Sequence, residues 1–450
     1  MANNSVSSTN SANPAIFEKI FHLTAKNTSV RTELLAGLTT FISLAYILFV
    51  NPNILSAAGI PKEAAVAATI FTAAITTALM GIVANYPVAL APSMGLNAFF
   101  TFYVVGTLHL PWQVALGAVF ISGVFFFILT LGGIRQAIIR AVPINLKKAI
   151  GVGIGLFISF IGLKGTGIII ADKATYLTLG HVTEPTVLLS IFGLLLTGGL
   201  MARGVRGSIL IGIFAVTIIS MALGLSPVPH SIGDVMSLSF PSVGETFWAF
   251  DLKGAWEFGI FSIVFTFTVV ELFDNIGTLI GLTTKAGMVN KNGDIENIDK
   301  ALTIDSIGTM LSAIFGTSTV GSYIESASGI AEGGRTGLTA VTVSLLFIVS
   351  LVFAPLIGLV PAFATSPSLI IVGLLMMSSI GDINFSDFDE ALPAFLTIIM
   401  MPMTSSIANG FAFGFVSYTI MKIIKGKFSD ISIIMWIVSI AFLINLGLRG

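Results

Sequence analysis

Apolar runs of about 20 residues recur along this chain from Leu34 almost to its end. As a helix, each run is long enough to cross a hydrocarbon core about 30 Å thick. Charged residues make up only 10% of the 450 residues, too few to cover the surface of a soluble protein of this size. The sequence therefore predicts an all-α polytopic membrane protein.

Glycine, proline and charged residues divide the apolar runs into two groups of seven. The first group lies near 34–52, 64–84, 87–105, 113–132, 148–170, 186–202 and 207–225, and the second near 256–282, 299–316, 317–331, 338–360, 366–380, 391–405 and 408–424. We therefore expect a polar tail (1–33), a first seven-span repeat (34–225), a connecting segment (226–255), a second repeat (256–424) and a C-terminal segment (425–450). The short apolar stretch 433–448 either crosses the membrane or lies along its surface.

Lysine and arginine accumulate in the cytoplasmic loops of membrane proteins. If the N-terminus is cytoplasmic, 16 of the 21 basic residues lie in cytoplasmic segments and 4 lie in segments on the opposite side of the membrane. The side of the remaining one, Arg449, depends on whether the stretch 433–448 crosses the membrane. This distribution predicts a cytoplasmic N-terminal tail and a location in the cell membrane. The tail contains no apolar stretch of the kind found in a cleavable signal peptide, so we expect the first span to direct insertion.

The content of metal-binding and charged residues excludes several classes of function. The chain contains no cysteine, which excludes thiolate metal sites, and its four histidines lie outside the apolar runs. A net charge of −1 gives no indication of nucleic-acid binding. We expect no cofactor and no metal site. An intramembrane enzyme is the least favoured class, because it would need a Ser–His pair, an Asp–Asp pair or a metal site within the spans.

Two segments are too rich in proline, glycine and polar residues to be ordinary spans. Residues 87–100 contain two prolines and Asn97, and residues 315–329 contain three glycines and Glu325. Such residues break helical hydrogen bonds, and lipid supplies no replacement partners, so we expect half-helices preceded by extended backbone at the centre of the protein. The two segments occupy matching places in two groups of seven, and an odd number of spans inverts the second group. This pattern is typical of an inverted-repeat transporter with a binding site at the membrane midplane.

Four acidic residues lie within the apolar runs: Glu271, Asp274, Asp305 and Glu325. A charged side chain at the bilayer centre costs at least about 2.5–3.5 kcal/mol, so such residues face a cavity, form pairs, or bind protons or substrate. Glu271 and Asp274 share a helical face, and repulsion between their carboxylates favours protonation of one of them. We predict proton coupling through Glu271, Asp274 and Glu325. Glu271 could equally pair with a basic group, and Asp305 could equally cap or pack its helix.

Three motifs resemble those of the AzgA-like purine permeases, which belong to the nucleobase–cation symporter superfamily together with the uracil and xanthine permeases. The motifs are Asn85–Phe100, Leu272–Leu279 and Tyr323–Thr339, and the resemblance extends from about Arg31 to Lys427. It implies fourteen spans in two inverted repeats, with a core domain of spans 1–4 and 8–11 and a gate domain of spans 5–7 and 12–14. It also implies short antiparallel strands in spans 3 and 10, between which a nucleobase binds.

The polar binding site of this family corresponds to Asn97, Asp274 and Glu325 in this chain. Gly95, Phe99 and Ser322 are further candidate contacts of the substrate. A carboxylate accepts hydrogen bonds from the ring N–H groups of an oxopurine, and the amide of Asn97 can donate to its carbonyl. The chain departs from the family pattern at Glu271, where the family often has Asp, and at Asn275. The motifs therefore indicate the family more specifically than they indicate the substrate.

The residues and the resemblance together predict a secondary active transporter that imports purine nucleobases by proton symport and alternating access. Hypoxanthine and guanine are the favoured substrates and adenine is a further candidate, because the motifs look closer to the hypoxanthine/guanine branch. A sodium-coupled symporter and a facilitative channel are the alternatives. We expect purine nucleobases and membrane lipids as partners, and the sequence leaves a homodimer open.

Overall fold

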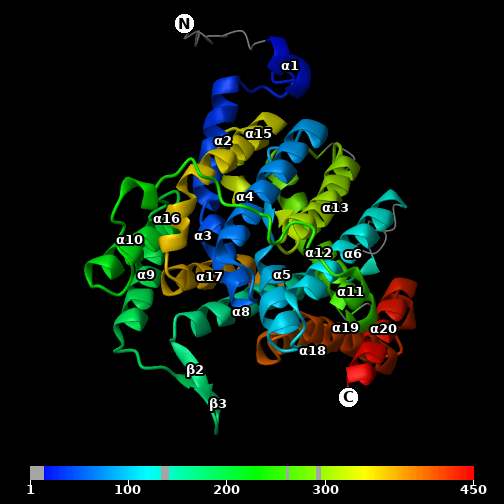
Figure 1. The fold of residues 1–450 in the computed structure, drawn as a ribbon. Helices are drawn as coiled ribbons and strands as arrows, with labels where there is room; N and C mark the ends of the chain where they lie inside the picture. The colour runs from blue at the N-terminus through cyan, green and yellow to red at the C-terminus, as the bar shows by residue number, and fades with distance from the viewer. Residues whose placement is uncertain (1–14, 133–140, 260–262, 290–294, 450) are drawn as a thin grey trace, which may run out of the picture.

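The computed structural model describes residues 15–132, 141–259, 263–289 and 295–449 (Figure 1). Within these residues, eight helical segments are long and apolar enough to cross a membrane. They are Val30–Ala57, Lys62–Ala84, Trp112–Leu131, Ile144–Gly165, Pro185–Ala202, Gly337–Leu359, Ala362–Asp382 and Ile407–Ile424. The expectation of a helical, multi-pass membrane protein is therefore confirmed.

The elements up to residue 222 cover part of the predicted tail, which contains the first helix, and the first predicted repeat. They are α1 (Ala15–Phe21), α2 (Val30–Leu44), α3 (Ile47–Ala57), α4 (Lys62–Leu79), η1 (Met80–Ala84), β1 (Leu90–Pro92), α5 (Met94–Ala98), η2 (Phe99–Val105), α6 (Trp112–Leu131), α8 (Ile144–Gly165), β2 (Ile169–Asp172), β3 (Tyr176–Leu179), α9 (Pro185–Ala202) and α10 (Ser208–Ala222). The connecting segment contains the short helix η3 (Ile232–Asp234).

The remaining elements begin with a helix that starts at the end of the connecting segment. They are α11 (Leu252–Gly259), α12 (Phe265–Lys285), α13 (Ile298–Phe315), β4 (Val320–Ser322), α14 (Ser326–Ala331), α15 (Gly337–Ser350), η5 (Leu351–Phe353), α16 (Ala354–Leu359), α17 (Ala362–Met376), η6 (Met377–Asp382), α18 (Phe388–Met403), α19 (Ile407–Ile424), η7 (Phe428–Asp430) and α20 (Ile433–Arg449). The stretch 433–448, for which the sequence leaves a membrane crossing open, lies within the helix α20.

Six of the fourteen predicted spans are not among the eight long apolar helices, for different reasons. Predicted spans 3 and 10 are broken by strands, and α10 and α18 contain only 15 and 16 residues. Helix α13 carries three charged residues, Asp299, Lys300 and Asp305, and several side chains of α12 lie outside the described part of the structure. The predicted span 256–282 begins as α11, and its continuation α12 starts at Phe265, with residues 260–262 outside the described part.

The helices pack into two groups, which we call the core bundle and the gate bundle. In the core bundle, α15 packs on α2 and α4, α14 on α2, and α13 on α4 and α6. In the gate bundle, α17 packs on α8 and α9, α18 on α8 and α19, and α20 on α19. The core bundle comprises the described elements from α2 to η2 with α6 and α11–α16, and the gate bundle comprises α8–α10 and α17–α20. This grouping matches the core and gate domains that the resemblance implies.

The two broken segments meet inside the core bundle. Strands β1 and β4 pair antiparallel, with Leu90 opposite Ser322, Ala91 opposite Gly321 and Pro92 opposite Val320. The pairing continues beyond the strands, because Tyr323 N donates to the carbonyl of Ala89 at 3.0 Å. Backbone groups that no helix can satisfy are thus paired within the protein, as lipid burial requires. The short antiparallel strands that the resemblance implies in these two segments are present.

A side chain of α4 completes the hydrogen bonds of β1. The Thr77 hydroxyl donates to the carbonyl of Leu90 at 2.8 Å and accepts from the N–H of Leu90 at 2.9 Å. On the opposite side, Gly321 has no room for a side chain, since a Cβ there would lie 2.3 Å from Asn275 Oδ1. The strand pair is therefore held between α4 and α12.

A hairpin interrupts the fold where the sequence predicts the end of a span at residue 170. Helix α8 ends at Gly165, and β2 and β3 then form an antiparallel pair that projects from the bundle (Figure 1). The carboxylate of Asp172 closes the hairpin turn by accepting from the N–H groups of Ala174 and Thr175, both at 2.8 Å. The span predicted at 148–170 is thus too long at its end, because apolar residues of this hairpin continue the hydrophobic run.

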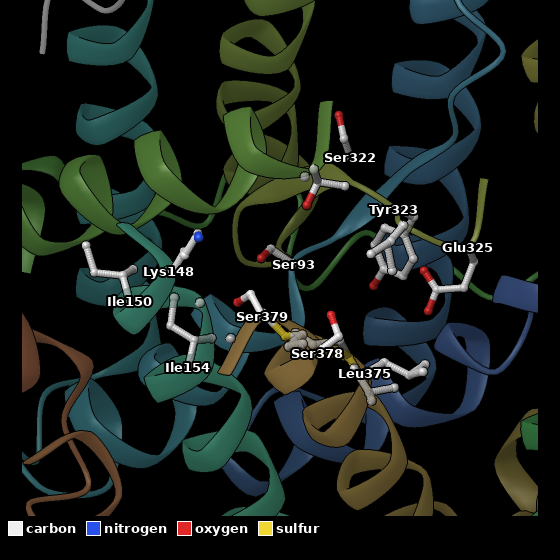
Figure 2. Close-up of a pocket in the computed structure, with 18 of the residues that line it drawn as sticks. Ser93, Lys148, Ile150, Ile154, Ser322, Tyr323, Glu325, Leu375, Ser378 and Ser379 are labelled. Carbon is white, nitrogen blue, oxygen red and sulfur yellow. The ribbon is translucent and has the colours of Figure 1, made fainter. Parts of the chain in front are cut away.

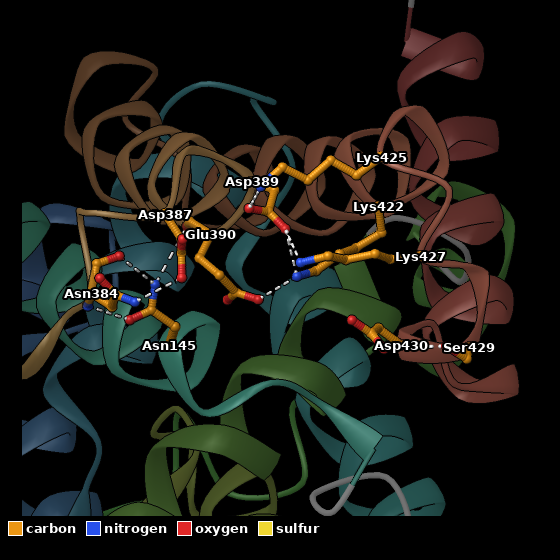
Figure 3. A network of polar contacts seen from close by, with 10 residues as sticks. All are labelled: Asn145, Asn384, Asp387, Asp389, Glu390, Lys422, Lys425, Lys427, Ser429 and Asp430. Atoms are coloured by element: carbon orange, nitrogen blue, oxygen red, sulfur yellow. Dashed lines mark hydrogen bonds and ion pairs between the residues drawn. The ribbon is translucent and has the colours of Figure 1, made fainter.

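Polar contacts also fix the start of α8 in the gate bundle (Figure 3). Asn145 accepts from the backbone N–H of Asn384 at 2.7 Å. Nearby, the buried carboxylate of Asp389 on α18 pairs with Lys422 of α19 at 2.9 Å and with Lys425 and Lys427. These contacts join α8, α18 and α19 at one end of the gate bundle.

One buried carboxylate lies where the sequence predicts the polar tail 1–33. Glu33 is in the first turn of α2 and is fully buried. Its oxygens accept from the backbone N–H groups of Arg335 at 2.9 Å, Thr336 at 3.3 Å and Thr339 at 3.2 Å, and from the Thr339 hydroxyl. The last residue of the predicted tail therefore satisfies the N-terminal backbone donors of α15, which a helix cannot satisfy by itself.

We expect Glu33→Ala to lower the melting temperature of the purified protein by several degrees. The substitution leaves buried N–H groups without an acceptor, at about 1–3 kcal/mol for each group. Glu33→Gln is the matched control, because it keeps one acceptor oxygen and should cost less. Equal melting temperatures for the alanine variant and the unaltered protein would show that this carboxylate does not hold α15.

Candidate functional site

A cavity of about 520 Å³ lies between the core bundle and the gate bundle. The core bundle contributes Tyr46, residues 93–95 after β1, and residues 321–325 at the start of α14. Figure 2 shows Tyr323 and Glu325 on one side of the cavity and Lys148, Ile150 and Ile154 of α8 on the other. The end of α17 and η6 complete the gate side. The cavity thus lies where two separately packed groups of helices meet.

The polar end of the cavity is formed by the segment that follows β4. Glu325 precedes the first turn of α14 and is half-buried, and the hydroxyl of Tyr46 donates to its Oε1 at 2.6 Å. The buried hydroxyl of Ser322 has no hydrogen-bond partner among the described residues, although it lines the cavity. A carboxylate therefore borders a largely apolar space, with the buried hydroxyl of Ser322 beside it, an arrangement that suits a flat ligand with polar edges.

The basic residues of the lining lie on the gate bundle. Lys147 and Lys148 belong to the second turn of α8, and Lys148 Nζ donates to the backbone carbonyl of Asp382 at 3.0 Å. Among the described lining residues, Glu325 is the acidic one. The acidic and basic groups of the cavity thus belong to different bundles.

Two of the predicted substrate contacts lie behind the cavity rather than in it. Asn97 is fully buried, where its amide donates to Asn51 Oδ1 and its carbonyl oxygen accepts from the hydroxyl of Ser318. Phe99 is fully buried as well, stacked on Tyr103 and edge-on to Phe267. In this conformation protein partners therefore occupy both side chains, and a contact with a ligand would require them to exchange those partners.

Gly95 and Ser322, by contrast, line the cavity, and their contact with a substrate stays a prediction. Glu271 does not line it, since its carboxylate is fully buried and accepts from the hydroxyl of Thr309 on α13. Asp305 is also buried and accepts from the amide of Asn275 at 3.0 and 3.1 Å. The position of Asp274 belongs to α12, and its side chain lies outside the described part of the structure.

Several residues of the cavity carry no signal in the sequence. Tyr46 lies in an apolar run, and Ser378 and Ser379 lie at the end of another. Nothing in the local pattern separates these residues from packing residues, because their role depends on contacts far along the chain. The side-chain hydroxyl of Tyr46 and the carboxylate of Glu325 are 279 positions apart.

The described residues contain no group of three or more His, Cys, Asp or Glu side chains that could hold a metal ion.

Comparison with known proteins agrees with the motifs. The model of the Permease family (Xan_ur_permease) matches residues 31–443. The chain belongs to this family. Its relatives include the putative permease MJ0326 of Methanocaldococcus jannaschii, which is 48% identical over 94% of this permease and 97% of the relative. Members of the family are permeases and not enzymes.

Two relatives have more specific names. The adenine permease AdeQ of Escherichia coli is 44% identical, with 95% of each chain covered. The guanine/hypoxanthine permease PbuO of Bacillus subtilis is 43% identical, over 95% of this permease and 99% of the relative. The predicted resemblance to purine permeases is therefore confirmed.

The fold is shared with a solved transporter. The transmembrane domain of the cyanobacterial bicarbonate transporter BicA superposes with a TM-score of 0.62, over 83% of this permease and 95% of that chain. Only 16% of the residues are identical, so the likeness concerns the fold.

We expect Gly95→Ala to destabilise this permease, because Gly95 of α5 lies against α8 across the boundary between the bundles. An added Cβ would lie 2.8 Å from Ile154 Cγ2, and overpacking of this kind costs about 1–3 kcal/mol. Ile154→Ala should restore the melting temperature of the Gly95→Ala variant. Gly151→Ala, where a Cβ would meet nothing within 4 Å, is the control on α8. Failure of Ile154→Ala to restore stability would argue against this contact.

Proposed function

We propose that this permease is a secondary active transporter that imports purine nucleobases by proton symport. Hypoxanthine and guanine are the first candidates. Adenine stays a candidate, since relatives named for adenine and for guanine and hypoxanthine are about equally similar. The observation that carries the proposal is Glu325, a carboxylate on a half-helix that faces a cavity between two bundles.

The chemistry of the cavity supports a free base as substrate. In our proposal, Glu325 accepts hydrogen bonds from ring N–H groups, and the hydroxyl of Ser322 meets a carbonyl or ring nitrogen of the base. Apolar residues such as Leu375 and Ile154 would cover the faces of the ring. Gly95 would allow the ring close to the backbone of α5. Asn97 would act from behind, by holding the half-helix in place through Asn51 and Ser318.

We further propose fourteen spans in two inverted repeats, 34–225 and 256–424, joined by 226–255. The paired strands β1 and β4 occupy matching places in these two repeats, which supports the inversion. Shorter helices such as α10 can span where the bilayer thins around them. The distribution of basic residues supports a cytoplasmic location for the tail 1–33 and the segment 425–450, in a cell-membrane protein.

Transport would occur by movement of the core bundle against the gate bundle. The cavity has one wall on each bundle, so a relative displacement would open it to one side and then to the other. Lys147 and Lys148, which line the cavity, belong to the side that is cytoplasmic in our proposed topology. The conformation described here is thus, in our proposal, open to the cytoplasm.

If protons drive transport, cells that express the permease should concentrate hypoxanthine, and a protonophore should abolish the accumulation. Uptake would be measured in a host that lacks its own purine transport, with and without sodium. Accumulation that resists the protonophore and disappears without sodium would replace proton coupling with sodium coupling. Uptake that never exceeds the external concentration would point to a facilitative channel.

We expect Glu325→Gln to weaken hypoxanthine binding about tenfold or more, because a hydrogen bond to a charged group contributes about 1.5–3 kcal/mol. Glu271→Gln is the matched control, since Glu271 is bound by Thr309 outside the cavity. This control should leave binding nearly normal and shift the pH dependence of uptake. Asp274→Asn should abolish binding or coupling.

Binding to the purified variants and uptake against pH would be measured in parallel, with membrane abundance checked for each. Wild-type affinity and pH dependence in Glu325→Gln would refute the proposed site. Loss of binding in Glu271→Gln together with normal binding in Asp274→Asn would reverse the roles of those two residues.

A further inference from the structure

Tyr46, which is not among the predicted site residues, contacts the carboxylate of Glu325, the residue that we propose binds the substrate. Tyr46 lies at the break between α2, which ends at Leu44, and α3, which begins at Ile47. Its side chain is 1% exposed, and its hydroxyl donates to Glu325 Oε1 at 2.6 Å. A buried phenol needs a hydrogen-bond partner, and this one is satisfied by a carboxylate rather than by backbone.

The contact has two chemical consequences for Glu325. First, it occupies Oε1 and restrains rotation of the carboxylate, so that Oε2 is the oxygen left for a ligand. Second, an O–H group that donates to a carboxylate favours the ionised form over the protonated form. The same hydroxyl therefore influences both the orientation of the carboxylate and the pH at which it takes up a proton.

We propose that Tyr46 is a positioning residue of the purine site, which directs Oε2 of Glu325 toward the base and opposes protonation of this carboxylate. This inference rests on the proposed function of the cavity. It extends that function by assigning the control of proton uptake to a residue of the first span. The break between α2 and α3 places the side chain opposite the half-helix that bears Glu325.

Other titratable groups face Glu325 from the surrounding elements. They are Tyr323 beside β4 and Lys147 and Lys148 of α8, which line the same cavity. Helix α12 also carries Glu271, which is bound by Thr309 away from the cavity, and Asp274, whose side chain lies outside the described part. Among the hydrogen bonds of Glu325 to described side chains, the one from Tyr46 acts directly on the carboxylate. The hydroxyl of Tyr323 is directed elsewhere, because it donates to the backbone carbonyl of Pro92 at 2.5 Å.

Tyr323 therefore offers a matched control within the same cavity. Tyr46→Phe and Tyr323→Phe each remove one buried hydroxyl from the lining, but only the first removes a donor to the carboxylate. Hypoxanthine binding to the full-length protein in lipid nanodiscs would be measured against pH for both variants. A purely structural effect of the lost hydroxyl would change the amount of folded protein or the affinity, but not the pH midpoint.

We expect Tyr46→Phe to weaken binding about tenfold at neutral pH and to move the pH midpoint of binding upward by at least half a unit. Loss of the donor makes protonation of Glu325 easier. The pH midpoint of binding therefore moves upward whether the purine binds the ionised or the protonated form of Glu325. Tyr323→Phe should leave the midpoint in place. In a Glu325→Gln background, adding Tyr46→Phe should move no midpoint, since the titrating group is already absent.

An unchanged midpoint in Tyr46→Phe, or an equal shift in Tyr323→Phe, would overturn the assignment of Tyr46. If Tyr46→Phe does not yield folded protein, Glu325→Asp is the second variant. It withdraws the carboxylate from the Tyr46 hydroxyl by one methylene and should weaken binding, and wild-type affinity in Glu325→Asp would likewise overturn the assignment. Absence of hypoxanthine binding to the unaltered protein would instead refute the proposed function.

Discussion

The structure depends on how it pairs backbone N–H and C=O groups where the helices are broken. Lipid offers no partner to a freed peptide group, so an interrupted span is tolerated only if another segment supplies the hydrogen bonds. Strands β1 and β4 supply them to each other, and Thr77 completes those of Leu90. The cavity follows from this pairing, since Ser322 ends β4, Glu325 follows it, and Gly95 lies shortly after β1.

The two bundles contribute different groups to the cavity. The core bundle contributes the carboxylate and hydroxyl groups near the strand pair, and the gate bundle contributes Lys147 and Lys148 at the start of α8 and aliphatic residues of α8 and α17. An apolar surface makes no directional contacts, so it can move past a polar site without breaking hydrogen bonds. Two polar contacts between described side chains nevertheless cross between the bundles. Asn53 of α3 donates to the hydroxyl of Thr365 on α17 at 3.2 Å, and Arg206, after α9, forms an ion pair with Glu332, after α14. An exposed pair of this kind contributes at most about 1 kcal/mol and would not prevent such movement.

Local sequence patterns predict the features that depend on local chemistry. Proline and glycine around residues 87–100 identify a broken span, and the cost of a charge in lipid identifies Glu325. The patterns do not distinguish a polar side chain that binds a ligand from one that forms its hydrogen bonds within the protein. Asn97 is polar and within a span, as a ligand contact would be, but Asn51 and Ser318 bind it. Glu33 and Tyr46 were not identified because their partners lie about 300 positions away, and no local pattern records such contacts.

The strand pair also has a consequence for how the chain is made. Tyr323, which follows β4, and Pro92, which ends β1, are 231 positions apart, and the hydroxyl of one bonds the carbonyl of the other. A ribosome that has delivered the first half to the membrane has therefore not yet supplied the partner of β1. Until β4 arrives, Leu90–Pro92 must be shielded by the insertion machinery, by water or by α4. The binding site is thus assembled late in biosynthesis, and the first half of the chain on its own would lack it.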